Sequence, residues 1–255
     1  MLLESCKIIK KHERRPGLFD FTFESPQIAA QCRAGQFLHI KCGDGVLLRR
    51  PISICDFGDT TVRIIFEVRG EGTRLLSEKQ TDEALDVLGP LGRGFTDVFP
   101  GAKTLFIGGG IGIFPLLAHA KKYGKNATVL LGFKDKASIA LESDFTRFGA
   151  RVSIATDDGS YGHRGFVTAL LENALNEQIY DAVFACGPLP MLKKTVAACN
   201  DLGIFCEISM EQRMGCGVGA CLVCSCKTEK DDIISYSRVC ADGPVFNSKE
   251  VVFDA

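Results

Sequence analysis

Cysteine spacing near the end of the chain is the feature that most constrains this sequence of 255 residues. Of its twelve cysteines, five lie between residues 216 and 240. Four residues separate Cys216 from Cys221, two separate Cys221 from Cys224, and fifteen separate Cys224 from Cys240. A C-x4-C-x2-C run followed by a distant cysteine is the spacing of plant-type [2Fe–2S] sites. We therefore predict that these thiolates hold a [2Fe–2S] cluster.

Zinc and disulfides are the alternative explanations for these cysteines. Structural zinc sites usually show two short C-x2-4-C knuckles, whereas Cys240 stands alone. The sequence starts without the continuous apolar run of a secretory signal, so we expect a cytoplasmic protein, in which disulfides are rare. The fifth cysteine, Cys226, follows Cys224 too closely to be a further ligand, and we expect it to point away from the cluster as a spare thiol.

Three regions with different sequence patterns follow one another along the chain. Six strand-like runs separated by Gly, Pro or Asp turns predict a small antiparallel β barrel over residues 1–99. Five strand-like runs then alternate with helical ones, which predicts an α/β domain with an open, doubly wound parallel sheet over residues 100–209. The segment over residues 210–255 has little room for a core of its own, so its cluster should be structural as well as functional.

The run Arg50-Pro51-Ile52-Ser53 is the first candidate for flavin binding. A guanidinium suits a phosphate, and an edge strand that contains proline leaves backbone groups free for a ring. The run resembles the R-x-[YIS]-S element of ferredoxin reductases, which implies that Arg50 pairs with a flavin phosphate. Ile52 replaces the aromatic residue that often stacks on the flavin.

A second candidate, Gly70-Glu71-Gly72-Thr73, precedes a short apolar helical turn. A glycine and a hydroxyl at the start of a helix form a site for anions such as a pyrophosphate. The ferredoxin-reductase likeness further implies that the backbone of Ile65, Phe66 and Glu67 contacts the flavin. The alternative is an ordinary barrel in which Arg50 only covers a surface.

Glycines directly after the first strand of the second domain indicate a nucleotide loop. Gly108-Gly109-Gly110-Ile111-Gly112 stands between a strand and a helical stretch, although it is not the G-x-G-x-x-G fingerprint. Cys186-Gly187-Pro188 ends the fourth strand of this domain, and likeness to the reductases implies a place beside the nicotinamide ring; the alternative for Cys186 is a buried core residue. Thr156 to Ser160 are a candidate adenosine contact. Lys134 is the only nearby candidate for a 2′-phosphate, so NADH is favoured over NADPH.

The whole chain resembles the electron-transfer subunits of class 1B, NAD-dependent dihydroorotate dehydrogenases. The motifs that carry the resemblance are RRPISI, GEGT, GPLGRGF, GGGIGIFPL, DDGSYGHRG, CGP, EQRMGCGVGACLVC and RVCADGPVF. It implies bound FAD, a [2Fe–2S] cluster and NAD(H) as substrate. It also implies a partner subunit that contains FMN and oxidises dihydroorotate to orotate for pyrimidine biosynthesis, as a heterotetramer of two plus two chains.

The same resemblance suggests a mechanism and leaves alternatives. Flavin exchanges hydrides with nicotinamide and single electrons with an iron–sulfur centre. We expect no acid–base residue in this chain, since the histidines are scattered. Glu207 and Glu211 lie on the path to the cluster, and we expect solvated carboxylates there, with flavin contact as the alternative. A reductase that delivers electrons to a ferredoxin, free-standing or as a subunit, and a non-catalytic redox sensor remain open.

Composition excludes two classes of partner. A net charge of −1 gives no basis for binding nucleic acid. No apolar run approaches the length of about 20 residues that a membrane span needs.

Overall fold

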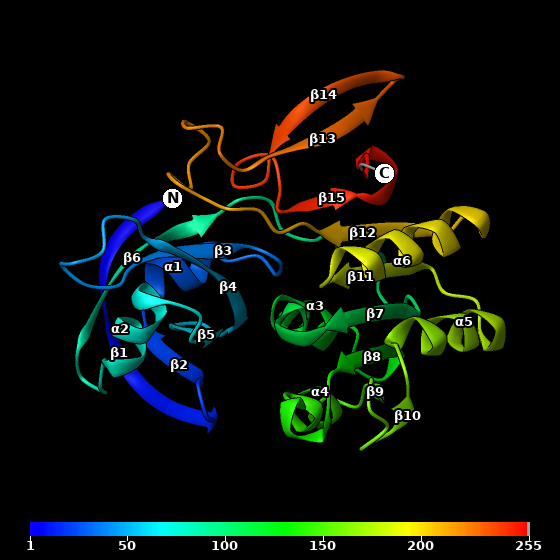
Figure 1. Cartoon of the computed structure of the whole chain (residues 1–255), viewed down its shortest axis with the longest axis horizontal. Helices are drawn as coiled ribbons and strands as arrows, with labels where there is room; N and C mark the ends of the chain where they lie inside the picture. Colours follow the sequence, from blue (N-terminus) through cyan, green and yellow to red (C-terminus); the bar gives the residue numbers. More distant parts are fainter. Residues whose placement is uncertain (254–255) are drawn as a thin grey trace.

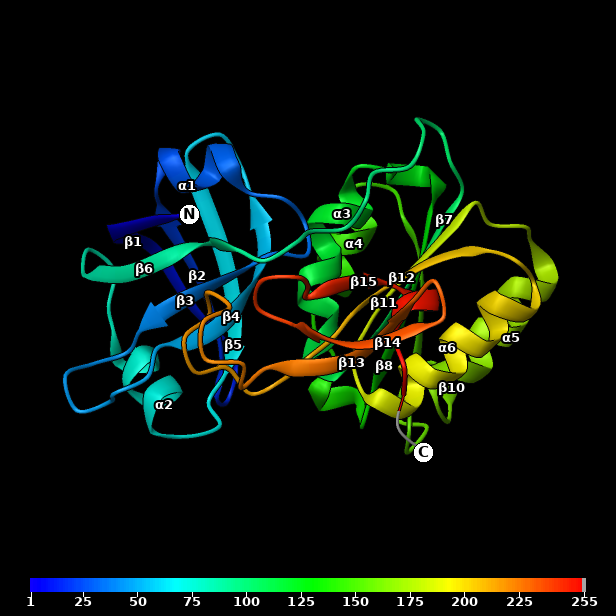
Figure 2. The same ribbon diagram turned by 90° about the horizontal axis from the view of Figure 1, so that it is seen from above.

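A computed structural model describes residues 1–253 and shows two lobes side by side, with the C-terminal segment lying across both (Figures 1 and 2). The first lobe is a closed antiparallel barrel with the strand order β1-β2-β5-β4-β3-β6. Its strands are β1 (Leu2–Arg15), β2 (Leu18–Glu24), β3 (Phe37–Lys41), β4 (Arg50–Phe57), β5 (Thr61–Glu67) and β6 (Ala84–Leu91). Two short helices accompany them, α1 (Pro26–Gln31) and α2 (Glu71–Glu78). The predicted barrel of six strands is confirmed.

Alternation along the strands decides which residues of the barrel face outward. In β4, Ile52 and Ile54 are buried in the barrel core, while Pro51 and Ser53, which alternate with them, are only half-buried. Successive side chains of a strand point to opposite faces, so the polar and proline positions stand on the outer face. That face is turned toward the second lobe.

The second lobe is a seven-stranded sheet with the order β10-β9-β8-β7-β11-β12-β15, covered by helices on both faces. Its parallel strands are β7 (Thr104–Gly109), β8 (Ala127–Phe133), β9 (Arg151–Thr156), β10 (His163–Arg164), β11 (Ala182–Cys186) and β12 (Phe205–Ser209). The helices are α3 (Leu117–Lys121), α4 (Glu142–Arg147), α5 (Val167–Glu177) and α6 (Leu189–Asp201). A 3₁₀ helix of seven residues forms η1 (Gly110–Leu116), and single 3₁₀ turns form η2 (Gly124–Asn126), η3 (Lys136–Ser138) and η4 (Ser248–Glu250).

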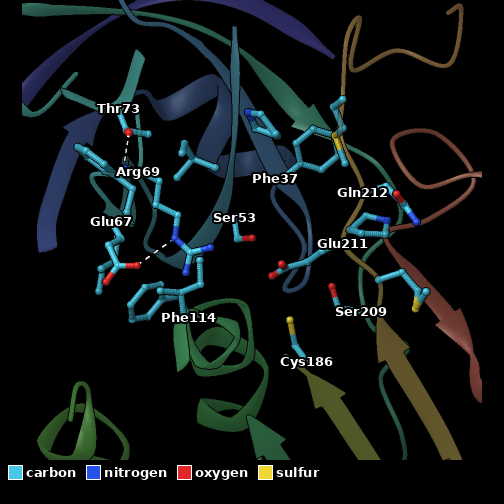
Figure 3. Close-up of a pocket in the computed structure, with 18 residues that line it drawn as sticks. Phe37, Ser53, Glu67, Arg69, Thr73, Phe114, Cys186, Ser209, Glu211 and Gln212 are labelled. Atoms are coloured by element: carbon cyan, nitrogen blue, oxygen red, sulfur yellow. Dashed lines mark hydrogen bonds and ion pairs between the residues drawn. The ribbon is translucent and has the colours of Figure 1, made fainter. Parts of the chain in front are cut away.

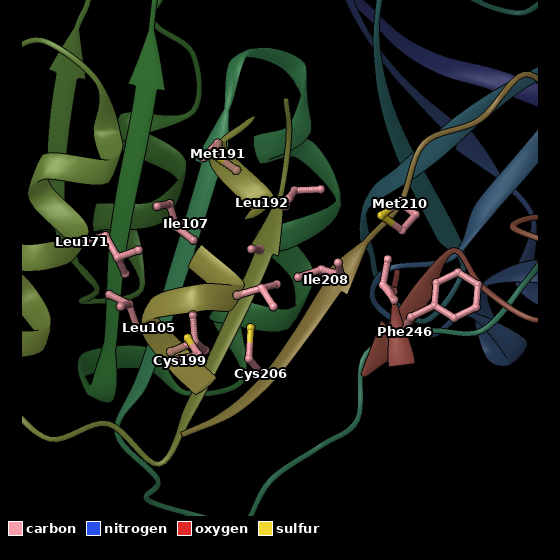
Figure 4. Packing of buried hydrophobic residues seen from close by; sticks show 14 of the residues in the cluster. Leu105, Ile107, Leu171, Met191, Leu192, Cys199, Cys206, Ile208, Met210 and Phe246 are labelled. Atoms are coloured by element: carbon pink, nitrogen blue, oxygen red, sulfur yellow. The ribbon is translucent and has the colours of Figure 1, made fainter. Parts of the chain in front are cut away.

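Buried apolar strands explain this sheet. Every residue of β11 is buried, as expected for a parallel strand that helices cover on both sides. Leu171 of α5 and Leu192 of α6 pack on one face of the sheet against Leu105 and Ile107 (Figure 4). The predicted doubly wound α/β fold is confirmed.

The glycine loop after β7 continues as the 3₁₀ helix η1 and becomes an α-helix only at Leu117. Pro115 lies inside η1, and proline cannot donate the backbone hydrogen bond that a regular α-helix needs. The helical stretch expected after the loop is therefore shorter than the apolar pattern indicates.

The C-terminal segment completes the sheet instead of standing apart. After the hairpin of β13 (Ser225–Lys230) and β14 (Ile233–Arg238), strand β15 (Val245–Asn247) pairs antiparallel with β12. Phe246 packs beside Met210 in the same apolar cluster as the sheet (Figure 4). The segment thus shares the core of the second lobe, as its small size requires.

Candidate functional site

A cleft of about 240 Å³ separates the outer face of the barrel from the carboxyl ends of β11 and β12. Ligands of open α/β sheets bind beyond the carboxyl ends of the strands. Figure 3 shows Glu67, Arg69 and Thr73 on the barrel side, with Cys186 and Glu211 facing them from the second lobe. The structure brings most of the predicted flavin residues to this cleft: Pro51, Ile52, Ser53, Ile65, Phe66, Glu67 and Thr73.

Arg50 and the turn before α2 form one end of this site. The Arg50 guanidinium lies against Gly72, where a Cβ atom would stand only 2.7 Å from Arg50 Nε. The Thr73 hydroxyl accepts hydrogen bonds from the backbone N–H groups of Arg69 (2.9 Å) and Gly70 (3.3 Å). A cation thus lies beside the first turn of a helix, an arrangement that suits a phosphate.

Glu67 is held by two cations. Its carboxylate accepts hydrogen bonds from Arg15 (2.9 Å) and Arg69 (3.0 Å). Partial burial opposes ionisation, but the hydrogen bonds from Arg69 and Arg15 outweigh it and lower the pKa of Glu67. With its side chain engaged in this way, Glu67 can offer its backbone to a ligand in the cleft.

Cys186 closes the cleft from the end of β11. The residue is 1% exposed, and burial raises the pKa of its thiol above the ordinary range. A Cβ atom on Gly112 would stand 2.5 Å from the Cys186 carbonyl oxygen, so the glycine loop and the end of β11 touch through their backbones. Cys186 is therefore a protonated thiol in a close-packed wall, without the features of a nucleophile.

Two further cavities extend from the glycine loop across the carboxyl end of the sheet. One, of about 350 Å³, is lined by residues that include Gly109, Gly110, Gly112, Gly187 and Pro188. The other, of about 450 Å³, is lined by Lys134, Asp157 and other residues at the ends of β8 and β9. Gly108 is buried behind them, in contact with Ile113. The predicted nicotinamide residues therefore lie along one continuous edge of the sheet.

The residues of the predicted adenosine contact, Thr156 to Ser160, have different surroundings in the structure. Asp157 lines the larger cavity, whereas the carboxylate of Asp158 accepts hydrogen bonds from the N–H and hydroxyl groups of Ser160. The Thr156 hydroxyl is buried and donates to the backbone carbonyl of Tyr161 (2.7 Å). Among these acidic and hydroxyl residues, Asp157 is the one that lines the cavity of about 450 Å³.

The expectation of a solvated carboxylate at Glu207 is wrong. Glu207 is 2% exposed and accepts hydrogen bonds from the N–H group and the hydroxyl of Thr96, both at 2.7 Å. It therefore ties β12 to the connection between the lobes. Glu211 is exposed, as expected, and it also lines the flavin-side cleft. Partial desolvation raises the pKa of its carboxyl, and Arg69 partly offsets this.

Backbone N–H groups surround the sulfur atoms of the C-terminal cysteines. Val218, Ala220 and Cys221 donate to Cys216 Sγ at 3.3–3.4 Å, and Gly219 donates to Cys240 Sγ at 3.1 Å. Gly217 and Gly219 take φ angles of +72° and +84°, a region that favours glycine. Desolvation opposes ionisation of Cys216, but the amide donors outweigh it and lower the pKa to about 6. This lining stabilises thiolates, the form that binds metal.

The thiols fall into two pairs. The Cys216 N–H contacts Cys221 Sγ, and the Cys240 N–H contacts Cys224 Sγ, both at 3.4 Å. Among residues 1–253, no group of three or more His, Cys, Asp or Glu side chains is arranged around a single metal ion. Two pairs of thiolates suit two irons with two ligands each, so the residues fit a [2Fe–2S] cluster better than a zinc ion.

Cys226 is the fifth cysteine of this segment. It is 7% exposed within β13 and belongs to the apolar cluster of the second lobe. Burial raises the pKa of its thiol to about 11. It is a buried cysteine, and the expectation that it points away from the cluster as a spare thiol stays a prediction.

His39 was not among the predicted site residues, yet it lies between the flavin-side cleft and the cluster loop, which we define as residues 212–224. It is 1% exposed in β3, and desolvation, followed by the charge of Arg49, lowers its pKa. The only sequence signal is a polar residue within the otherwise apolar run of a strand. Arg69 and Phe114 also line the cleft and were missed. Arg69 lies outside the motifs, and Phe114 is part of the run GGGIGIFPL, of which only the glycines were singled out.

Across the whole described length, no helix combines the span and the apolar character needed to cross a bilayer.

Comparison with known proteins supports this arrangement. A profile described as the iron-sulfur cluster binding domain of dihydroorotate dehydrogenase B matches residues 211–252. The electron transfer subunit of dihydroorotate dehydrogenase B (NAD(+)) from Caldanaerobacter subterraneus subsp. tengcongensis is 40% identical over 249 residues, which are 97% of this chain and 98% of that protein. The match extends through both lobes and the cluster segment.

Solved structures share the fold. A NADH-dependent reduced ferredoxin-NADP oxidoreductase has a TM-score of 0.83 at 29% identity and covers 97% of this chain and 89% of its own. A ferredoxin NADP+ reductase from Neisseria gonorrhoeae has a TM-score of 0.65 at 20% identity over 80% of this chain and 92% of its own. With identity maintained over nearly the full length of the curated relative, the chain belongs to the family of electron transfer subunits of dihydroorotate dehydrogenase B.

Proposed function

We propose that this chain passes electrons between NAD(H) and a dihydroorotate-oxidising partner, by way of FAD and a [2Fe–2S] cluster. The observation that carries the proposal is the sharing of one cleft by three elements. Pro51 and Ser53 of the barrel, Cys186 of the nicotinamide edge, and Gln212 and Met214 at the start of the cluster loop all line it. A ligand in this cleft would touch both the donor and the acceptor side of an electron path.

FAD fits the barrel side of the cleft. Arg50, Gly72 and Thr73 would hold its pyrophosphate, and the outer face of β4 and the end of β5 would hold its ring. FAD supplies the exchange of hydrides with nicotinamide and of single electrons with the cluster. The protein would hold the flavin and the nicotinamide in a fixed orientation, and the close packing around Cys186 would keep water out of that part of the site.

The nicotinamide would lie along the edge formed by Gly108, Gly109, Gly110, Gly112 and the Cys186-Gly187-Pro188 turn. A Cβ atom added at Gly108, Gly109 or Gly112 would clash with neighbouring atoms. Only backbone atoms can therefore form the surface at these three positions. The names of the relatives specify NAD(+), and Asp157 at the ribose end is an acidic neighbour that suits a free hydroxyl better than a phosphate.

Cys216, Cys221, Cys224 and Cys240 would hold the cluster. We assign the FAD barrel to residues 1–99, the nicotinamide domain to 100–209 and the cluster module to 210–255. Since β15 contributes to the sheet, the last of these is a module in function and not an independently packed unit.

The partner would be an FMN-containing catalytic subunit, in a heterotetramer of two plus two chains. Large apolar side chains are exposed in the C-terminal segment, both on the cluster loop and on β14: Val218, Leu222, Val223, Ile233, Ile234 and Tyr236. Large apolar side chains exposed within one segment favour an interaction site there. Their exposure argues against a free-standing reductase. We place the complex in the cytoplasm, in keeping with the unpaired state of the cysteines among residues 1–253.

An anaerobic absorption spectrum before and after addition of NADH tests the electron path. Flavin bands and a broad cluster absorbance that both bleach with NADH are expected. Cys221→Ser should keep the flavin bands and lose the cluster absorbance. A protein with zinc and no iron would refute the cluster, and an unbleached flavin would refute the nicotinamide site.

Co-purification with a dihydroorotate-oxidising subunit tests the partner. Val223→Glu should weaken the complex while leaving NADH-dependent bleaching intact, with Leu47→Glu, an exposed position on the barrel, as the matched control. Retention of the complex by the Val223→Glu variant would contradict the proposed surface.

A further inference from the structure

His39 lies where the outer face of the barrel meets the cluster loop. It is paired with Pro51 across β3 and β4, and Pro51 lines the flavin-side cleft. Directly opposed residues of an antiparallel pair project from the same face, so the ring stands beside the cleft wall. On its other side the ring contacts Gly217, where a Cβ atom would stand 2.6 Å from His39 Nδ1. Gly217 directly follows Cys216.

The burial of this ring is costly. His39 is 1% exposed, and neither ring nitrogen has a hydrogen-bond partner among residues 1–253. An imidazole always carries at least one N–H group. A buried donor without an acceptor destabilises the folded state, which an apolar side chain of the same size would avoid. Backbone groups of Arg49 and Cys216 lie near the ring and partly offset the lowering of its pKa, but neither makes a hydrogen bond to a ring nitrogen. The position therefore has room for a further acceptor on the side of the cluster loop.

We propose that His39 is a positioning residue for the iron–sulfur centre, whose ring N–H donates to the sulfur shell held by the cluster loop. The amide donors on the cysteine sulfurs come from the cluster segment itself, from residues such as Val218, Gly219 and Ala220. His39 adds a side-chain donor from the barrel, which ties the cluster to the lobe that would hold the flavin.

This donor also sets the reduction potential. Hydrogen bonds to the sulfurs are one of the factors that determine the potential of an iron–sulfur centre. The centre becomes more negative when it accepts an electron, so an N–H group beside its sulfurs stabilises the reduced form more than the oxidised form. Loss of the donor lowers the potential.

The inference rests on the proposed assignment of the four cysteines, and a spectroscopic experiment separates the two. Protein with both cofactors is prepared with the heavy nitrogen isotope in its histidine rings, reduced, and studied by pulsed electron paramagnetic resonance. The electron spin of the reduced cluster should couple to a labelled ring nitrogen. The coupling should vanish in His39→Asn and persist in His12→Gln, which alters an exposed histidine of β1.

Two results would overturn the proposal: a normal cluster signal without histidine coupling, or a coupling that persists in His39→Asn. Absence of any iron–sulfur signal would instead refute the assignment of the cysteines. A redox titration adds a second readout. His39→Phe, which fills the space without an N–H group, should shift the midpoint potential downward, and His39→Asn, which keeps an N–H group, should shift it less. Equal midpoint potentials in the unsubstituted protein, His39→Phe and His39→Asn would contradict the proposal and show that His39 is only a core residue.

Discussion

Burial of His119 in α3 should make the stability of this protein depend on pH. The ring is 0% exposed, stacks on Phe95 at 5.2 Å between centroids and meets Phe184 edge-on at 4.4 Å. Neither ring nitrogen has a hydrogen-bond partner among residues 1–253. Desolvation, with a smaller contribution from Lys122, lowers the pKa of His119 from 6.5 to about 4, against an opposing effect of Asp97.

The sign and size of the effect follow from proton linkage. Because the folded state binds the proton less tightly than the unfolded state, acid favours unfolding. The stability associated with neutral His119 is complete above pH 6.5 and is lost as the pH falls toward 4. A shift of this size corresponds to about 3 kcal/mol over the whole window and to about 2 kcal/mol between pH 7 and pH 5, at about 1.4 kcal/mol per pKa unit.

Urea unfolding at pH 7 and pH 5, followed by circular dichroism, measures this term. Phenylalanine can occupy the site among the aromatic rings without titrating, so the loss of stability between the two pH values should be about 2 kcal/mol smaller in His119→Phe than in the unsubstituted protein. Acid effects on the cofactors and other groups are common to both proteins and cancel in the difference. His12→Gln, at an exposed position, should behave like the unsubstituted protein. Parallel pH dependences of the unsubstituted protein and His119→Phe would refute the reasoning.

Three further substitutions test other parts of the structure. Gly112→Ala places a methyl group 2.5 Å from a backbone carbonyl; we expect a loss of about 1–3 kcal/mol and much slower NADH reduction of the flavin in stopped-flow traces, with Gly45→Ala, which meets no atom within 4 Å, unchanged. Glu207→Gln keeps the shape but weakens the two hydrogen bonds from Thr96, and urea unfolding should show a loss of about 1–3 kcal/mol with the cluster absorbance intact. Cys226→Ser should retain the iron and sulfide content of the unsubstituted protein, and loss of iron would make this residue a ligand.

The sequence predicted the features that depend on residues close together in the chain. Strands of the barrel are separated by recognisable turns, and the cysteine spacing is contained within one segment. Strand β15, by contrast, has only three residues, too few for an alternating pattern to be recognised. Its place in the sheet is decided by its partner β12.

Contacts between distant residues account for the remaining differences. Glu207 looks like a strand-end carboxylate exposed to solvent, and its burial depends on Thr96, which lies 111 residues earlier. His39 looks like an isolated polar residue in a strand, and its contact with Gly217 spans the two ends of the chain. Local patterns carry no information about such pairs, so the sequence indicated the cofactors but not the residues that connect their sites.

The pairing of β12 with β15 explains how a small loop-rich segment can hold a redox centre in a fixed place. The chain leaves the sheet at Ser209 and returns at Val245, and these two residues are paired directly in the register. The two ends of the segment that carries the cluster cysteines therefore lie side by side, and there the Met210 N–H donates to the Pro244 carbonyl at 2.8 Å. Ser209, Met210 and Pro244 all line the flavin-side cleft. Bringing the ends of such an excursion together costs entropy, which the sheet hydrogen bonds and the apolar contact of Phe246 offset. The residues at the two ends of the cluster segment thus form one side of the flavin site. A substitution that weakens the pairing of β15 with β12 should therefore disturb the cluster and the flavin together.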